Sequence, residues 1–169
     1  TLFGYEKGAF TGAQQAQAGK FEQAQDGTLL LDEVTEMPMG LQAKLLRVLQ
    51  EREVERVGGK KPVPLNIRII ATSNRDMAEA VAKGVFREDL YYRLNVFPIA
   101  IPALRQRPDD IVAIARHFVA EHGGRFGRTG MSLSPDAEAA LSAHAWPGNI
   151  RELENVIQRA LIMAPGNTI

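Results

Sequence analysis

Two acidic side chains directly follow a short apolar run and could hold a metal ion or move a proton. Asp32 and Glu33 come after residues 27–31, Gly-Thr-Leu-Leu-Leu, whose continuous hydrophobicity is typical of a parallel strand buried on both faces. An acid at the carboxyl end of such a strand lies where α/β proteins bind ligands. In nucleotide hydrolases the first acid of such a pair holds Mg²⁺, directly or through water, and the second orients the attacking water. The residues alone leave open a purely structural role as a helix N-cap.

A second polar pair follows the next candidate strand. Ser73 and Asn74 come soon after residues 66–71, in which three isoleucines supply the apolar side chains. If the two strands are parallel neighbours, an amide at this strand end could reach a γ-phosphate or the attacking water. An Asn at the end of a strand is also a common turn residue. The sequence does not separate these two interpretations.

Two arginines in one segment could recognise phosphate. Arg87 and Arg93 lie six residues apart in residues 86–93, Phe-Arg-Glu-Asp-Leu-Tyr-Tyr-Arg, with two acids between them. Planar guanidinium groups bind phosphate oxygens through paired N–H donors. The alternative is a solvated helix face on which the arginines form local ion pairs with those acids.

Residues 8–13, Gly-Ala-Phe-Thr-Gly-Ala, are an unusual composition for a protein core. Two glycines frame an aromatic and a hydroxyl side chain, and this suits an exposed loop tip better than packing. The alternative is a flexible surface turn without a partner.

A third arginine lies where a helix is predicted to begin. Residues 146–155 read Trp-Pro-Gly-Asn-Ile-Arg-Glu-Leu-Glu-Asn, so that Asn149 is expected to cap the helix and Glu152 to complete a capping box. Arg151 then lies in the first turn, where a cation opposes the helix dipole. This placement favours an anionic partner, and a local ion pair with Glu154 explains it equally well.

The elements that must position these residues change character along the chain. Strands and helices alternate at first, and only helices follow later, with Ser134 expected as an N-cap and Pro135 at the first helical position. The pattern predicts an α/β domain over residues 1–104 and a small helical subdomain over residues 105–169. Candidate strands cover residues 27–31, 66–71 and 96–101, a shorter alternating segment covers residues 53–57, and candidate helices cover residues 40–50, 77–83, 109–122, 135–144 and 149–163.

Composition excludes several classes of protein. The chain has 169 residues, 45% of them hydrophobic, which is enough for roughly one domain that folds without a metal or a disulfide. Its 20 basic and 20 acidic residues argue against a strongly basic nucleic-acid binder and against an acidic tail. The lack of cysteine excludes thiol catalysis, iron–sulfur clusters and cysteine zinc sites. No apolar run approaches the roughly 18 residues that span a bilayer, and the chain does not begin with a signal peptide. The lack of cysteine fits the cytoplasmic location that we expect.

Together these segments resemble the central AAA+ ATPase domain of bacterial enhancer-binding proteins, the activators of sigma-54 RNA polymerase. Residues 8–13 carry the GAFTGA signature of that family, and residues 27–33 resemble its Walker B strand. Residues 86–95 (FREDLYYRLN) and 146–155 (WPGNIRELEN) match two further family segments in the expected order. The resemblance covers essentially the whole chain and implies part of an AAA+ P-loop NTPase α/β subdomain followed by an α-helical lid.

The resemblance implies an ATP site with Mg²⁺ at the predicted strand ends. Asp32 would coordinate the metal and Glu33 would activate the water. Ser73 and Asn74 would form the element that the family calls sensor I. The nucleotide would contact Asp32, Glu33 and Asn74, together with Arg151 as sensor II on the lid.

The resemblance also implies two sets of contacts with other molecules. Arg87 and Arg93 would be arginine fingers that enter the site of a neighbouring subunit. The loop that touches sigma-54 would have Phe10 and Thr11 at its tip, and residues 51–64 would form a second loop that moves with it. The whole sigma-54 contact would comprise Gly8, Ala9, Phe10, Thr11, Gly12 and Ala13.

The implied parent protein is a hexameric or heptameric ring that hydrolyses ATP to remodel the closed promoter complex. Its partners would be sigma-54 RNA polymerase and, through a domain outside this chain, promoter or enhancer DNA, with no membrane involved. The family's phosphate-binding loop, G-x-x-x-x-G-K-[ST], does not occur in residues 1–169 and is expected before Thr1. We therefore expect the chain, which has no initiator Met, to be the distal two-thirds of a catalytic domain that binds ATP poorly by itself.

Three other functions compete with this interpretation. A different AAA+ machine would share the acids and arginines but has no reason to carry GAFTGA. A DNA-binding helix-turn-helix over residues 134–163 would place Glu152 and Glu154 where basic residues are needed. A non-catalytic fragment that binds sigma-54 or its own ring neighbours remains the main alternative for the isolated chain.

Overall fold

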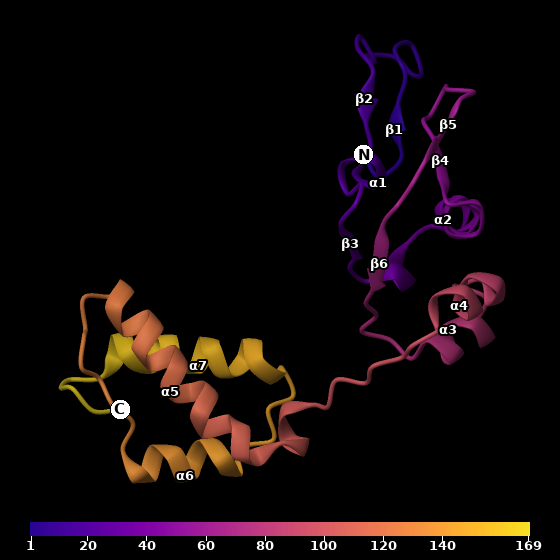
Figure 1. Ribbon diagram of the computed structural model, residues 1–169. Coiled ribbons are helices and arrows are strands. Elements are labelled where there is room, and N and C mark those ends of the chain that lie inside the picture. The colour runs from indigo at the N-terminus through magenta and orange to yellow at the C-terminus, as the bar shows by residue number, and fades with distance from the viewer. The chain divides into compact units, whose positions relative to one another are not determined.

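The computed structural model describes residues 1–169, which form two compact units, Thr1–Pro98 and Ile99–Ile169 (Figure 1). The first unit contains strands and helices, and the second contains helices. The sequence predicted the division after residue 104, six residues later. Leu104 is fully buried in the core of the helical unit, which explains why the packing changes before that residue.

The first unit is built on two parallel strands. β3 (Thr28–Leu31) and β6 (Arg68–Ala71) pair with Leu31 opposite Ala71, as the apolar runs predicted. The expectation that this strand is buried on both faces was wrong. Leu30 is 58% exposed and Ile70, its partner in the register, is 49% exposed. Because side chains alternate along a strand, one face of the pair packs on the core and the other is open.

The third predicted strand, residues 96–101, is absent. Its four large apolar side chains are each more than three quarters exposed, and the segment makes no strand pairing. Pro98 cannot donate a ladder hydrogen bond, and the segment has no neighbouring strand with which to pair.

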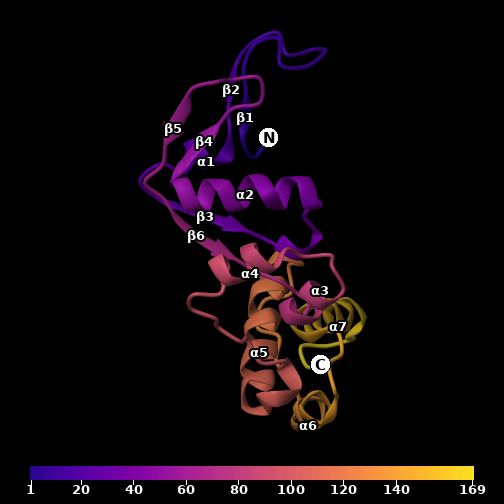
Figure 2. The ribbon, with the colours of Figure 1, turned by 90° about the vertical axis from the view of Figure 1, so that its right-hand side faces the viewer.

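Three of the helices in the first unit lie between residues 39 and 94. α2 (Met39–Glu51) corresponds to the helix predicted over residues 40–50 and buries Gln42, Leu45 and Val48. Figure 2 shows α2 between the β3–β6 pair and the hairpins of this unit. α3 (Met77–Ala82) and α4 (Glu88–Leu94) follow β6. The core of this unit consists of Phe3, Phe21, Leu31, Val34, Leu45, Val48, Val54, Leu65, Ile67, Ala80, Phe86 and Leu90.

Two antiparallel hairpins project from the same end of the first unit (Figures 1 and 2). The first, β1 (Gly4–Tyr5) with β2 (Gln17–Ala18), was not predicted, and the short helix α1 (Lys20–Gln23) follows it. The second joins β4 (Glu53–Glu55) to β5 (Pro62–Pro64). Its prolines are tolerated because the hairpin has only edge strands.

The second unit packs three helices around a separate core. α5 (Pro108–Arg125), α6 (Pro135–Ala143) and α7 (Asn149–Met163) match the predicted helices, and the turn η2 (Leu104–Gln106) precedes them. The Ser134 hydroxyl caps α6 by accepting a hydrogen bond of 3.1 Å from the Ala137 N–H, as predicted. No helix of the chain has the length and apolar character needed to cross a bilayer.

The predicted cap of α7 was wrong. Gly148 precedes the helix, and the Glu152 carboxylate accepts a hydrogen bond of 2.7 Å from its N–H. Asn149 instead has a positive φ of 50°, and its side-chain oxygen accepts a hydrogen bond of 2.8 Å from the Leu104 N–H. The Asn149 side chain therefore holds η2 against α7 instead of capping the helix.

Candidate functional site

The carboxyl ends of β3 and β6 bring the predicted acids and polar residues together. Because the two strands are parallel and in register, Asp32 and Thr72 are the next facing pair after Leu31 and Ala71. The Thr72 N–H donates a hydrogen bond of 2.9 Å to the Leu31 carbonyl, and the Val34 N–H donates one of 2.9 Å to the Thr72 carbonyl. The backbone ladder thus continues one step beyond the sheet and fixes the positions of both acids.

Asn74 contacts the second acid. Its side-chain amide donates a hydrogen bond of 3.2 Å to Glu33 Oε1. Glu33 precedes the short helix η1 (Val34–Glu36), but its carboxylate makes no cap hydrogen bond, so the capping alternative is not observed. Asp32, Glu33 and Asn74 are all exposed to solvent at this edge and are accessible to a ligand.

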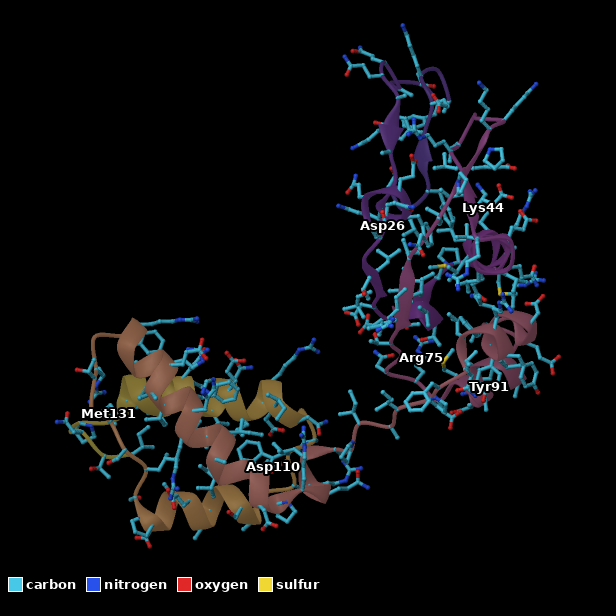
Figure 3. All side chains as sticks on the ribbon, in the orientation of Figure 1. Asp26, Lys44, Arg75, Tyr91, Asp110 and Met131 are labelled. Atoms are coloured by element: carbon cyan, nitrogen blue, oxygen red, sulfur yellow. The ribbon has the colours of Figure 1, made fainter.

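Ser73 has a different role from Asn74. Its hydroxyl accepts a hydrogen bond of 3.1 Å from the Arg75 N–H and donates one of 2.9 Å to the Arg75 carbonyl, which closes a tight turn. Thr35 Oγ1 lies 3.2 Å from the same hydroxyl. Figure 3 labels Arg75 just beyond the carboxyl end of β6, where its guanidinium pairs with Glu36. Of the predicted pair, Asn74 reaches the acids and Ser73 stabilises the turn that presents it.

This edge suits a magnesium ion that is bound partly by carboxylates of the chain and partly by the oxygens of a phosphate. Nowhere in residues 1–169 do three or more His, Cys, Asp or Glu side chains converge as a metal cage. Mg²⁺ does not require such a cage, since it commonly binds one or two carboxylates and completes its shell with water and substrate phosphates. Asp32 and Glu33 provide such a pair of exposed carboxylates. The donor set therefore suits a metal–nucleotide complex better than a free ion.

The two predicted finger arginines lie at opposite ends of α4. Arg87 precedes the helix and donates hydrogen bonds of 2.9 and 2.7 Å to the two carboxylate oxygens of Asp89. This ion pair raises the pKa of Arg87 and lowers the pKa of Asp89. It is the local ion pair named as the alternative, but three of the five guanidinium N–H groups remain free for a phosphate.

Arg93 has no acidic partner within the chain. Its guanidinium donates a hydrogen bond of 3.0 Å to the Leu49 carbonyl and lines a cavity of about 690 Å³ at the amino ends of β3 and β6. Asp32 and Glu33 do not line this cavity. Neither arginine forms a hydrogen bond with Asp32 or Glu33 in the chain.

Gln42, which the sequence analysis did not single out, positions Arg87. It is fully buried on α2, and its amide donates hydrogen bonds of 2.7 Å to the Met37 carbonyl and 3.0 Å to the Val85 carbonyl. Its side-chain oxygen accepts a hydrogen bond of 2.9 Å from the Arg87 N–H. A polar residue on the apolar face of a predicted helix was the signal that could have identified it.

Residues 8–13 form the tip of the β1–β2 hairpin. Phe10 is 52% exposed, and its ring packs edge-on against Tyr5 with centroids 4.9 Å apart. Gly8 and Gly12 have φ values of 81° and 102°, which favour glycine, and open space surrounds both. The two glycines therefore allow the chain to turn twice and present Phe10 and Thr11 to solvent.

The second hairpin is attached to the first. The Glu6 N–H donates a hydrogen bond of 3.0 Å to the Val57 carbonyl, and the Val57 N–H donates one of 3.0 Å to the Gly4 carbonyl. Gly58 lies so close to the loop tip that a Cβ there would come within 2.9 Å of Ala9 Cβ. If one hairpin tip is displaced, the other tip must therefore move with it, or the contacts between the two hairpins must break.

Arg56, also missed from the sequence, connects both hairpins through ion pairs. It donates hydrogen bonds of 2.9 and 2.6 Å to the two carboxylate oxygens of Glu22, which follows β2, and one of 3.2 Å to Glu6. The hydrogen bonds from Arg56 hold the pKa of the Glu22 carboxyl below its usual value, although burial acts in the opposite direction. The same hydrogen bonds raise the pKa of Arg56.

Arg151 belongs to the second unit and is exposed in the first turn of α7. It forms no ion pair with Glu154, whose carboxylate lies 3.0 Å from Nε2 of the buried His122. The local ion pair that was the alternative for Arg151 is therefore not formed, and its guanidinium is free of acidic partners.

Sequence comparison finds two families along the chain. Residues 1–100 match the sigma-54 interaction domain, and residues 105–169 match the AAA+ ATPase lid domain. The response regulator protein FleR of Pseudomonas aeruginosa is 61% identical over 169 residues, which are all of this chain and 36% of FleR. The transcriptional regulatory protein FlbD of Caulobacter vibrioides is 56% identical over 168 residues, or 99% of this chain and 37% of FlbD. The chain thus spans about a third of the length of these curated relatives.

Solved structures show the same fold. The crystal structure of NtrX from Brucella abortus matches with a TM-score of 0.89 and 41% sequence identity, over 98% of this chain and 37% of that one. NtrX in complex with ATP matches with a TM-score of 0.86 and 40% identity, over 98% of this chain and 36% of that one. The likeness confirms the predicted α/β subdomain followed by a helical lid.

Proposed function

The chain belongs to the sigma-54 interaction domain family of AAA+ transcriptional activators. We propose that it supplies the catalytic acids at the carboxyl ends of β3 and β6 and the sigma-54-binding loop of a ring-shaped ATPase. NtrX was crystallised with ATP and with ADP, which supports a nucleotide as the ligand. The whole protein uses hydrolysis to remodel the closed complex of sigma-54 RNA polymerase at a promoter. Contact with promoter or enhancer DNA is assigned to parts of that protein outside residues 1–169.

The acids perform different tasks in this proposal. Asp32 holds Mg²⁺, and Glu33 orients a water molecule for in-line attack and accepts its proton. When bound, Mg²⁺ neutralises charge on the phosphate oxygens. Asn74 holds the Glu33 carboxylate by the hydrogen bond of 3.2 Å and reports whether the γ-phosphate is present. Ser73 acts through the turn that it closes.

The arginines complete the site from a neighbouring subunit of a hexamer or heptamer. Arg87 and Arg93 neutralise charge that develops on the phosphoryl oxygens, a contribution of roughly 10³–10⁵ in rate for arginine fingers in general. Arg87 can bind phosphate through the three guanidinium N–H groups that its ion pair with Asp89 leaves free. Hydrolysis therefore depends on assembly. The further role of Arg151 as a phosphate ligand stays a prediction.

The Gly8–Ala13 loop couples hydrolysis to sigma-54. Its tip exposes Phe10 and Thr11, and the hydrogen bonds between Glu6, Gly4 and Val57 attach it to the second hairpin. A nucleotide can transmit a change only if the two loop positions differ in free energy between the nucleotide states. The shared contacts of the hairpins support a joint movement of both loops.

The observation that carries the proposal is the convergence of Asp32, Glu33 and Asn74 at one sheet edge in a chain that also presents GAFTGA at a hairpin tip. The test measures ATP hydrolysis and open-complex formation by the whole protein with sigma-54 RNA polymerase. Both activities are expected, and both should be lost in Glu33→Gln. Capture of sigma-54 without any ATP hydrolysis would instead support the non-catalytic alternative.

A further inference from the structure

Thr72, which the sequence analysis passed over, is the residue whose side chain contacts both acids. It directly follows β6, and its hydroxyl donates a hydrogen bond of 2.5 Å to Asp32 Oδ1. The Glu33 N–H donates a hydrogen bond of 3.1 Å to the same hydroxyl oxygen. An ionised carboxylate only accepts and a backbone N–H only donates, so the directions of both bonds follow from the chemistry.

The backbone holds Thr72 in place for these contacts. Its N–H bonds to the Leu31 carbonyl, and its carbonyl accepts a hydrogen bond from the Val34 N–H, each at 2.9 Å. Four hydrogen bonds thus connect this one residue to residues 31–34. The hydroxyl therefore has a fixed position relative to both acids.

Glu33 has a backbone conformation that needs this support. Its φ of 53° and ψ of 51° are left-handed, a region that residues with a side chain seldom occupy unless the surroundings hold them there. The Thr72 hydroxyl provides the acceptor for the Glu33 N–H in that conformation. From the other side, Asn74 binds the Glu33 carboxylate.

We propose that Thr72 is a positioning residue that fixes the Asp32 carboxylate as a metal ligand and the Glu33 backbone at once. The inference rests on the proposed function, because it assigns a role to Thr72 in the same metal–nucleotide site. The hydroxyl occupies one lone pair of Oδ1 and restricts rotation of the carboxylate, so that Asp32 would hold a metal ion in one orientation. Without the hydroxyl, the carboxylate turns freely and Glu33 loses an acceptor.

The expected size of the effect follows from metal sites in general. Removing a residue that orients a ligand weakens metal binding by about 10- to 100-fold. Thr72→Val keeps nearly the same shape without the hydroxyl, whereas Thr72→Ser keeps the hydroxyl and loses only the methyl group. Thr28→Val is the matched control, because Thr28 lies on β3 and its exposed hydroxyl makes no hydrogen bond in the chain.

The experiment measures Mn²⁺ binding by electron paramagnetic resonance, with the whole protein saturated by ADP so that no turnover occurs. Thr72→Val is expected to weaken Mn²⁺ binding by about 10- to 100-fold, whereas Thr72→Ser and Thr28→Val stay within about threefold of wild type. ADP affinity, measured in EDTA, should change little in Thr72→Val. A lowered melting temperature together with wild-type Mn²⁺ affinity would instead indicate a merely structural role.

Two results would overturn this role while leaving the proposed function intact. One is wild-type Mn²⁺ affinity in Thr72→Val, and the other is a loss in Thr72→Ser as large as that in Thr72→Val. If Thr72→Val does not fold, Thr72→Ala, which also lacks the hydroxyl, takes its place in the comparison with Thr72→Ser. A wild-type protein that binds ADP but no Mn²⁺ would contradict both the role of Thr72 and the proposed metal site.

Discussion

The side-chain amide of Asn74 donates a hydrogen bond of 3.2 Å to Glu33 Oε1 and thereby joins two residues that are 41 positions apart in the chain. The parallel register of β3 and β6 makes this contact possible, because it brings both strand ends to one edge. A carboxylate held in this way can keep one orientation toward water. The contact therefore links the fold directly to the proposed chemistry.

Asn74→Ala should reduce ATP hydrolysis by about 100-fold, because a poorly oriented group loses roughly that factor when it moves by about 1 Å. Nucleotide affinity should change little. Asn95→Ala is a suitable control, since the Asn95 amide contacts only the exposed hydroxyl of Tyr91. Steady-state turnover and nucleotide titration measure both quantities, and wild-type turnover in Asn74→Ala would remove the residue from this role.

Arg87→Ala should abolish hydrolysis, by roughly 10³- to 10⁵-fold, and leave nucleotide binding largely intact. Two observations support this expectation. The ion pair with Asp89 leaves N–H donors of Arg87 free, and Arg87 makes no hydrogen bond to Asp32 or Glu33 of its own chain. Arg47→Ala is the control, because Arg47 pairs with Glu51 on the exposed face of α2. A variant with normal turnover would show that Arg87 serves only its ion pair with Asp89.

Thr11→Ala should separate hydrolysis from transcription. Thr11 is exposed at the tip of the first hairpin and is remote in sequence from the acids, so ATP turnover should remain within about threefold while open-complex formation is lost. Gln15→Ala, at another exposed position of the same hairpin, should retain both activities. Loss of both activities in Thr11→Ala would indicate a folding defect and not uncoupling.

Glu22→Gln should change how stability depends on pH. Arg56 holds the pKa of Glu22 below its ordinary value of 4.5, so the folded state gains stability above that value and loses it as the pH falls through the lowered pKa. The variant lacks this titration, and its melting temperature should fall less steeply than that of wild type below about pH 5. Parallel thermal melts between about pH 3 and 7 measure the difference. Identical slopes for the two proteins would contradict the role of this ion pair.

Local sequence patterns predicted the elements whose apolar residues alternate or repeat clearly. The strands β3 and β6 and the helices α2, α5, α6 and α7 all lie close to their predicted ranges. The acids and Asn74 could be placed at strand ends because a parallel strand has only one ligand-binding end. The cap formed by Ser134 was predictable because it depends on residues only three positions apart.

Features that depend on distant partners could not be predicted in this way. β1 and β2 have two residues each and exist because they pair with one another, so neither has a pattern of its own. Residues 96–101 have the apolar composition of a strand but no partner in the chain. The contacts of Gln42, Arg56 and Thr72 cross from one element to another, so no local rule predicts their partners, although the polar Gln42 on an apolar helix face marks the residue itself.

The most direct test of the shared site mixes two inactive forms of the whole protein, Glu33→Gln and Arg87→Ala. In a mixed ring, about a quarter of the interfaces pair an intact Glu33 with an intact Arg87 from the neighbour, since each head-to-tail interface joins two different faces. We predict that ATP hydrolysis reappears on mixing, at about a quarter of the wild-type rate, while each variant alone stays inactive. A mixture as inactive as its components, with mixed rings verified by a tag on one variant, would contradict a catalytic site shared between subunits.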